Sequence, residues 1–166
     1  MNERIQALHD YLTAAHRETW AVLTGLKGED FQKHVYSSGD VEWSVRDVLA
    51  HMADAERGLL GQIRRLLVGE PTVPDDFDLN RWNRSAVRKR VGQSPQEILG
   101  DLDQAHHKIL TALSQVDPTQ LDRVGRHPSG KLLTVDGYFR RIADHRREHT
   151  ADIQRAAQAQ DQGRPE

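Results

Sequence analysis

The chain has 166 residues and contains no cysteine. This absence excludes disulfides, iron–sulfur clusters, thiolate metal sites and a cysteine nucleophile, so any bound metal must be held by His, Asp or Glu. The sequence also lacks a run of about 18 apolar residues, which a membrane-spanning helix needs. Its first ten residues, MNERIQALHD, have no apolar segment suited to a signal peptide. We therefore expect a cytoplasmic protein with no membrane partner.

The chain has no large excess of charge of either sign. Its net charge is −2 with neutral histidines, so electrostatics favour neither nucleic acid nor an anionic membrane. Basic residues do recur between Arg81 and Arg90, but an exposed helix face explains them and we predict no nucleic-acid partner. Hydrophobic residues make up 37% of the chain, and their periodic spacing predicts a folded helical protein.

Alternation with period two, which marks a half-buried strand, extends over no useful length, although 31–37 and 131–135 are ambiguous. Apolar residues recur instead at helical spacing in four segments, 3–24, 45–67, 95–116 and 135–157. Ser44 followed by Asp47, and Ser94 followed by Pro95 and Glu97, are typical helix starts.

We therefore predict an all-α fold, a four-helix bundle over residues 1–157, followed by a polar C-terminal tail at 158–166. The connections of about 15 to 25 residues exceed the usual 2 to 8 of simple bundles. At least one crossover between parallel helices is expected, and the link 69–93 is predicted to contain a short helix around 80–90. We find no internal repeat in the sequence.

Two histidines in the fourth segment, His145 and His149, lie four residues apart and therefore on one helix face. Both fall within the apolar sector, where two imidazoles can take adjacent positions on one metal ion. Alternatively, each could bond a neighbouring side chain or carbonyl group. His51, at the edge of the buried face of the second segment, could supply a further ligand or be a half-exposed helix histidine.

Other polar residues have two interpretations each. Asp152 could orient an imidazole as a hydrogen-bond acceptor or be a solvated acid. Glu56 is interpreted as an ionic or hydrogen-bonded core residue in preference to an outer partner of a metal ligand. Trp43 could wall a pocket or pack at a helix start, and Asn83 could bond in the cleft or cap the link helix. Surface or dimer contacts are preferred over substrate contacts for Arg140, Arg141, Arg146 and Arg147.

Residues 145–149 also match H-x-x-E-H, the pattern of inverted zinc peptidases. Those enzymes need a further acidic ligand well downstream, whereas only 17 residues follow His149. Glu148 is also expected to point out of the core, where a general base would be useless. We therefore disfavour a peptidase.

Four segments in order carry a resemblance to a known family: WSVRDVLAH at 43–51, LNRWN at 79–83, GKLLTVDGY at 130–138 and DHRREHTADI at 144–153. Over residues 5–157 the chain resembles the DinB/YfiT-like superfamily of metal-binding bundles. The resemblance implies an up-down-down-up bundle, a homodimer, and a three-histidine metal site at His51, His145 and His149. It implies zinc or nickel as the metal, with iron or manganese in some members.

Three neutral imidazoles leave coordination positions open, as at a catalytic metal. Such a metal can activate water or hold a thiol as thiolate, and without cysteine the thiol must come from a low-molecular-weight cosubstrate. Since some relatives are thiol-dependent, we predict a metal-dependent enzyme of the thiol-transferase or detoxification type, acting on a small molecule. The alternatives are a metal-dependent hydrolase and a non-catalytic, stress-related metal-binding module. The sequence designates no catalytic residue beyond the ligands.

Overall fold

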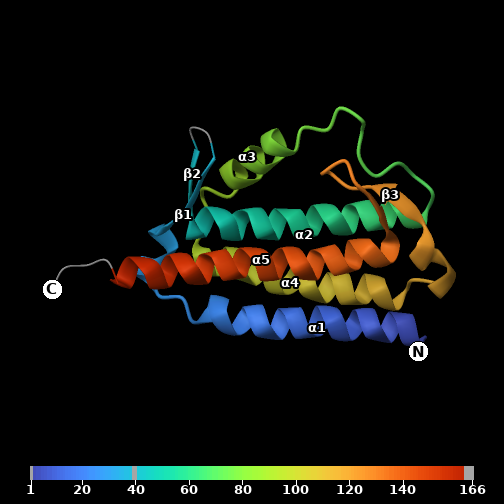
Figure 1. Ribbon diagram of the computed structural model, residues 1–166, viewed down its shortest axis with the longest axis horizontal. Helices are drawn as coiled ribbons and strands as arrows, with labels where there is room; N and C mark the ends of the chain where they lie inside the picture. The colour runs from blue at the N-terminus through green and yellow to red at the C-terminus, as the bar shows by residue number, and fades with distance from the viewer. Residues whose placement is uncertain (1, 39–40, 163–166) are drawn as a thin grey trace.

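Four long helices lie side by side in the computed structural model, which describes residues 2–38 and 41–162 (Figure 1). They are α1 (Glu3–Thr24), α2 (Val45–Leu67), α4 (Pro95–Ser114) and α5 (Val135–Gln162). Helices α1 and α5 run in one direction, and α2 and α4 run in the other (Figure 1). The predicted up-down-down-up bundle is therefore confirmed.

The link between the parallel helices α2 and α4 crosses the outside of the bundle. It contains α3 (Leu79–Lys89), the short helix that the sequence predicts. The link packs against α2 (Figure 1). This long crossover therefore covers one side of α2 with residues that a simple hairpin loop would not supply.

The predicted helix starts are confirmed by their capping contacts. The Ser44 hydroxyl accepts from the Asp47 amide while the Asp47 carboxylate accepts from the Ser44 amide, and Ser94 and Glu97 make the same reciprocal pair. At the other end of the chain, α5 continues to Gln162, beyond the residue 157 at which the bundle was expected to end. Residues 163–166 of the predicted tail lie outside the described residues, and the division into bundle and tail stays a prediction.

Two short hairpins are present, and only one strand of each, β1 and β4, falls in a segment that the sequence left ambiguous. Strand β1 (His34–Ser38) pairs with β2 (Val41–Ser44), and β3 (Val124–Arg126) pairs with β4 (Leu132–Thr134), both antiparallel. A 3-10 helix precedes each hairpin, η1 (Gly28–Gln32) and η2 (Pro118–Asp122). The strands are too short for period-two alternation to be visible in the sequence.

The structure contains a repeat of elements that the sequence does not reveal. The order helix, 3-10 helix, hairpin, helix occurs twice, and the second copy follows the first at a constant offset of 90 residues. Thus α2 begins at Val45 and α5 at Val135, and the equivalent amides donate to Lys33 O and Arg123 O. The segment from Thr24 to Val45 is as long as the segment from Ser114 to Val135, so neither copy has an insertion relative to the other.

The core consists of two apolar clusters, one toward each end of the bundle. Between them, each long helix contributes one polar residue to a layer across the interior: His16, Glu56, His106 and Arg146. We call these four residues the polar layer. Among the described residues, no helix combines the length and apolar character needed to cross a membrane.

Candidate metal centre

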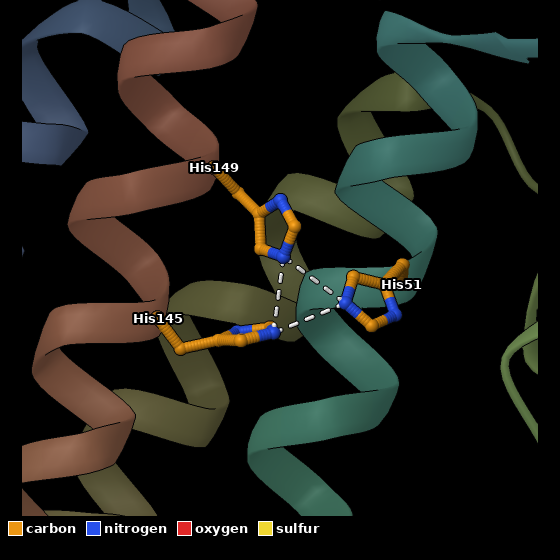
Figure 2. A group of neighbouring side chains, drawn as sticks. All are labelled: His51, His145 and His149. Atoms are coloured by element: carbon orange, nitrogen blue, oxygen red, sulfur yellow. Dashed lines mark hydrogen bonds between the residues drawn. The ribbon is translucent and has the colours of Figure 1, made fainter. Parts of the chain in front are cut away.

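Three imidazoles from two helices converge on one point (Figure 2). His51 comes from α2, and His145 and His149 come from consecutive turns of α5. The Nε2 atom of His51 lies 3.0 Å from that of His145 and 3.2 Å from that of His149, and the last two are 3.1 Å apart. The structure therefore brings together all three histidines that the sequence nominated.

The triangle of nitrogen atoms has the right size for one metal ion. Its centre is about 1.8 Å from each nitrogen, slightly less than a typical Zn–N distance of about 2.0–2.1 Å. The three nitrogens could therefore hold one ion together, and a set of three protein ligands would leave it at least one open coordination position. Three Nε2 lone pairs that face one another also favour a cation between them. The donor set thus fits a divalent metal with open coordination positions.

Burial keeps these imidazoles neutral. It lowers the pKa of His51 to about 4, with the neighbouring His149 as a further cause, and lowers the pKa of His149 to about 4. The pKa of His145 is held well below its usual value by burial and by the two other rings. At neutral pH each ring therefore has a lone pair available for a cation.

One outer ring nitrogen has a partner from another element. His149 Nδ1 lies 2.5 Å from the Tyr36 hydroxyl oxygen, while Asn83 of α3 lines the same cleft as His51 and opposes the lowering of the His51 pKa. When Nε2 is a metal ligand, Nδ1 carries the proton and donates it to such a partner. His145 Nδ1 is buried and has no hydrogen-bond partner among the described residues.

The β1–β2 hairpin covers the cluster with aromatic rings. Tyr36 contacts His149, and Trp43 meets the His51 ring edge-on at a centroid distance of 5.7 Å. For Trp43 the sequence left open a pocket wall or packing at a helix start, and the structure places its ring against His51; Tyr36 was missed. No spacing signal could have identified Tyr36, because its partner is 113 residues away.

Asp152, which the sequence suggested as a hydrogen-bond acceptor for an imidazole, mainly contacts another residue. Its carboxylate pairs with Arg155, and its charge adds to burial, the main cause, in raising the pKa of Tyr36. Through the described contacts Asp152 therefore influences His149 by way of the Tyr36 hydroxyl. Its direct role as an acceptor for an imidazole stays a prediction.

The three imidazoles line a cleft of about 840 Å³. Its walls come from α2, the link with α3, the β3–β4 turn and α5. Glu148 also lines the cleft, and it accepts hydrogen bonds of 2.9 and 3.1 Å from Arg141 Nη1. Its side chain is exposed, as expected, but it is at the mouth of the cleft.

The polar layer corrects one expectation for the arginines. Arg146 makes no surface contact but is 3% exposed and forms a bidentate pair with Glu56, with both N···O distances at 2.6 Å. Its remaining donors reach Leu102 O and His16 Nδ1. The interpretation of Glu56 as an ionic core residue is confirmed. The pair links α2 to α5, the two helices that carry the three histidines.

Comparison with known proteins agrees with this architecture. A protein of Oceanobacillus iheyensis named as a putative metal-dependent hydrolase is 24% identical over 153 residues, which cover 90% of this chain and 84% of that protein. The uncharacterized protein YuaE of Bacillus subtilis is 23% identical over 149 residues, covering 84% of this chain and 90% of YuaE.

Among solved structures, YfiT from Bacillus subtilis superposes with a TM-score of 0.76 at 18% identity, covering 97% of this chain and 90% of YfiT. YfiT is described as a probable metal-dependent hydrolase with an unusual four-helix bundle topology. This likeness confirms the fold, and the profile of the DinB superfamily matches residues 11–153. The chain belongs to the DinB superfamily.

Proposed function

We propose that His51, His145 and His149 hold one divalent metal ion, and that the chain is a metal-dependent enzyme acting on a small molecule. The convergence of three Nε2 atoms at 3.0–3.2 Å in the wall of a cleft carries this proposal. Structural zinc sites are usually closed by four protein ligands, whereas catalytic sites keep a position for water or substrate. Three neutral imidazoles facing a cleft match the catalytic pattern.

When bound there, a divalent ion would supply Lewis-acid activation of a water molecule or of a thiol. The chain's own residues hold the ion and shield it. Tyr36 fixes the orientation of the His149 ring, and the Trp43 ring limits the access of solvent to His51. Zinc or nickel suits the imidazole donors, and iron or manganese is also compatible with them.

We propose hydrolysis as the first reaction to test. The support is the name of metal-dependent hydrolase, qualified as putative or probable, that several relatives carry. The second candidate is thiol transfer, which the exposed Arg57 and Arg65 at the cleft favour because guanidinium groups bind the carboxylates of peptide-like thiols. In that reaction the sulfur comes from a cosubstrate, since the chain has no cysteine.

The experiment has two parts. Metal content is measured on the wild type, on His149→Ala and on His107→Ala, an exposed histidine of α4 that serves as the control. The metal-loaded protein is then tested on ester and amide substrates, and on small electrophiles with and without an added low-molecular-weight thiol. Turnover without thiol supports the hydrolase, and turnover only with thiol supports the transferase. Stoichiometric metal with ligand binding but no turnover would favour the non-catalytic module.

We further propose that the protein acts in the cytoplasm as a homodimer, with neither nucleic acid nor a membrane as a partner. The family resemblance and the near-neutral charge balance support these expectations. Light scattering coupled to size-exclusion chromatography measures the oligomeric state, and a monomeric mass would refute the dimer.

A further inference from the structure

The β3–β4 turn fixes one side chain at the wall of the cleft. The Gly130 amide donates to His127 O and the His127 amide donates to Lys131 O, each at 2.8 Å. Pro128 suits the second position of such a turn because its ring fixes φ, and Gly130 has a φ of 88°, which favours glycine. The sequence HPSGK at 127–131 therefore specifies a tight turn, and His127 lines the cleft from it.

The turn also decides which nitrogen of His127 carries the proton. The Ser129 backbone amide donates to His127 Nδ1 at 3.1 Å, and Ser129 Oγ lies 2.8 Å from the same atom. Since a backbone amide nitrogen only donates, Nδ1 is the acceptor, and in a neutral ring Nε2 then carries the proton. Burial, with the charges of Arg141 and Lys131 as further causes, lowers the pKa of His127 and keeps the ring neutral at neutral pH. Among the described residues Nε2 has no hydrogen-bond partner, so it can donate to a molecule in the cleft.

Arg141 offers further donors near this ring. It lies four residues before His145, and therefore on the same face of α5 and about 6 Å from it along the helix axis. Arg141 Nη1 donates to both carboxylate oxygens of Glu148, whereas its Nε and Nη2 make no hydrogen bond within the part of the chain that the structure describes. One edge of the guanidinium group is thus left for a molecule in the cleft, which Arg141 also lines.

The charges around the cleft favour an anion. The charged residues that line it in the described ranges are Arg57, Arg65 and Arg141, against one carboxylate, that of Glu148. A carboxylate suits both donors described above, because a guanidinium edge binds its two oxygens and an imidazole N–H adds a further hydrogen bond. Because Nε2 of His127 only donates, its partner must be an acceptor.

We propose that His127 and Arg141 bind a carboxylate group of the substrate beside the metal ion. The substrate class is then a small carboxylic acid whose reacting group lies about 6 Å from that carboxylate. His127 and Arg141 determine specificity by positioning the substrate, and they take no part in bond cleavage. The inference rests on the proposed function, because it requires the ion on the three histidines.

Two hydroxamates of equal chain length test the carboxylate site without knowledge of the substrate. Both chelate a metal through the same group, but succinic acid monohydroxamate ends in a carboxylate where butyrohydroxamate ends in a methyl group. Their dissociation constants are measured by calorimetry on the zinc-loaded wild type, on Arg141→Gln, on His127→Phe, and on His127→Gln, which keeps an N–H donor. Arg140→Gln is the matched control, because Arg140 is next to Arg141 in α5 but pairs with Asp136 and does not line the cleft.

We expect succinic acid monohydroxamate to bind the wild type and Arg140→Gln at least about 10-fold more tightly than butyrohydroxamate. The ratio should fall to within about 3-fold in Arg141→Gln and His127→Phe and recover in part in His127→Gln, while butyrohydroxamate binding changes little. An equal ratio in all the proteins would overturn the carboxylate site while leaving the metal site intact. Equal weakening of both probes in His127→Phe would also overturn it, because the loss would then not depend on the carboxylate.

Nitrogen NMR of the metal-free protein at neutral pH tests the tautomer separately. We expect the shifts of a protonated Nε2 and an unprotonated Nδ1 for His127, identified by their absence from His127→Gln. A protonated Nδ1 would refute the donor role of His127 whether or not a metal binds. If neither hydroxamate binds a protein that retains zinc, or if the wild type binds no zinc, the proposed function is refuted and the carboxylate site with it.

Discussion

The buried pair of Glu56 and Arg146 leads to a prediction about metal binding. We predict that the double variant Glu56→Leu/Arg146→Met remains folded but binds metal about 10-fold more weakly, a loss of about 1.4 kcal/mol. The physical reason is the axial alignment of α2 with α5. The two 2.6 Å contacts hold α2 against α5, the helices on which His51 and His145 lie, and apolar side chains would permit a small axial shift.

The single and double variants separate stability from positioning. Glu56 is fully buried and Arg146 almost so, so removing one partner leaves an uncompensated charge and should cost about 3–5 kcal/mol of unfolding free energy. Replacing both by apolar residues of similar volume removes two desolvated charges, and should be neutral or stabilising by about 1–4 kcal/mol. A stable double variant with weak metal binding is therefore the expected signature of a positioning role.

The assay combines chemical denaturation of the metal-free proteins with metal titration against a chromophoric chelator and with the visible spectrum of the Co²⁺ form. The control pair is Glu18→Leu/Arg147→Met, which removes a partly exposed contact between α1 and α5 and should change stability by no more than about 1 kcal/mol. A double variant at positions 56 and 146 with wild-type affinity and an unchanged Co²⁺ spectrum refutes the positioning role. If instead that variant is several kcal/mol less stable than the wild type, the description of the ion pair is wrong.

Three further predictions concern single residues. Tyr36→Phe removes the hydroxyl 2.5 Å from His149 Nδ1 and should weaken metal binding about 10- to 100-fold with the fold retained; an unchanged metal titration would contradict this. His149→Ala should lose stoichiometric metal while its helical circular dichroism stays near wild type, and full metal content would count against the triad. Burial lowers the pKa of His106 to about 3, with His16 and Arg146 as further causes, whereas the unfolded value is about 6.5. The unfolded chain therefore takes up this proton first, so His106 contributes a loss of up to about 1.4 kcal/mol per pH unit as the pH falls from about 6.5 toward 3. Denaturant unfolding of metal-free His106→Gln should show a shallower acid dependence than the wild type, and an identical slope would argue against a neutral, buried ring.

Local signals were enough to predict the helices and two of the three converging histidines. Ser44 and Ser94 act as caps within a few residues of their partners, and the spacing of His145 and His149 is a property of one helix. His51 is different, because periodicity places it only at the edge of a helix face. Its contact with His145, which is 94 residues away in the sequence, depends on how the helices pack. Only the family resemblance indicated that the two residues meet.

Contacts between distant segments could not be predicted from spacing. Tyr36 lies in a strand of only five residues. Arg146 bonds Glu56, which is 90 residues away, and nothing in the pattern of its own helix indicates that partner. The repeat was hidden for a related reason. Core positions tolerate different apolar residues of similar size, so Phe31 corresponds to Leu121 and both are buried without sequence identity.

The repeat also explains why polar residues meet in pairs at the centre of the bundle. Residues at equivalent positions face one another across the middle, so His16 stacks on His106 at a centroid distance of 3.9 Å, and Glu56 meets Arg146. Two like charges could not occupy such positions in the interior, which favours opposite charges at one pair and neutral rings at the other. The three-histidine cluster breaks this correspondence, because the equivalent of His51 is Arg141, a cation. A second three-histidine cluster is thereby excluded at the equivalent place, and the cluster that does form takes one imidazole from the first half of the chain and two from the second.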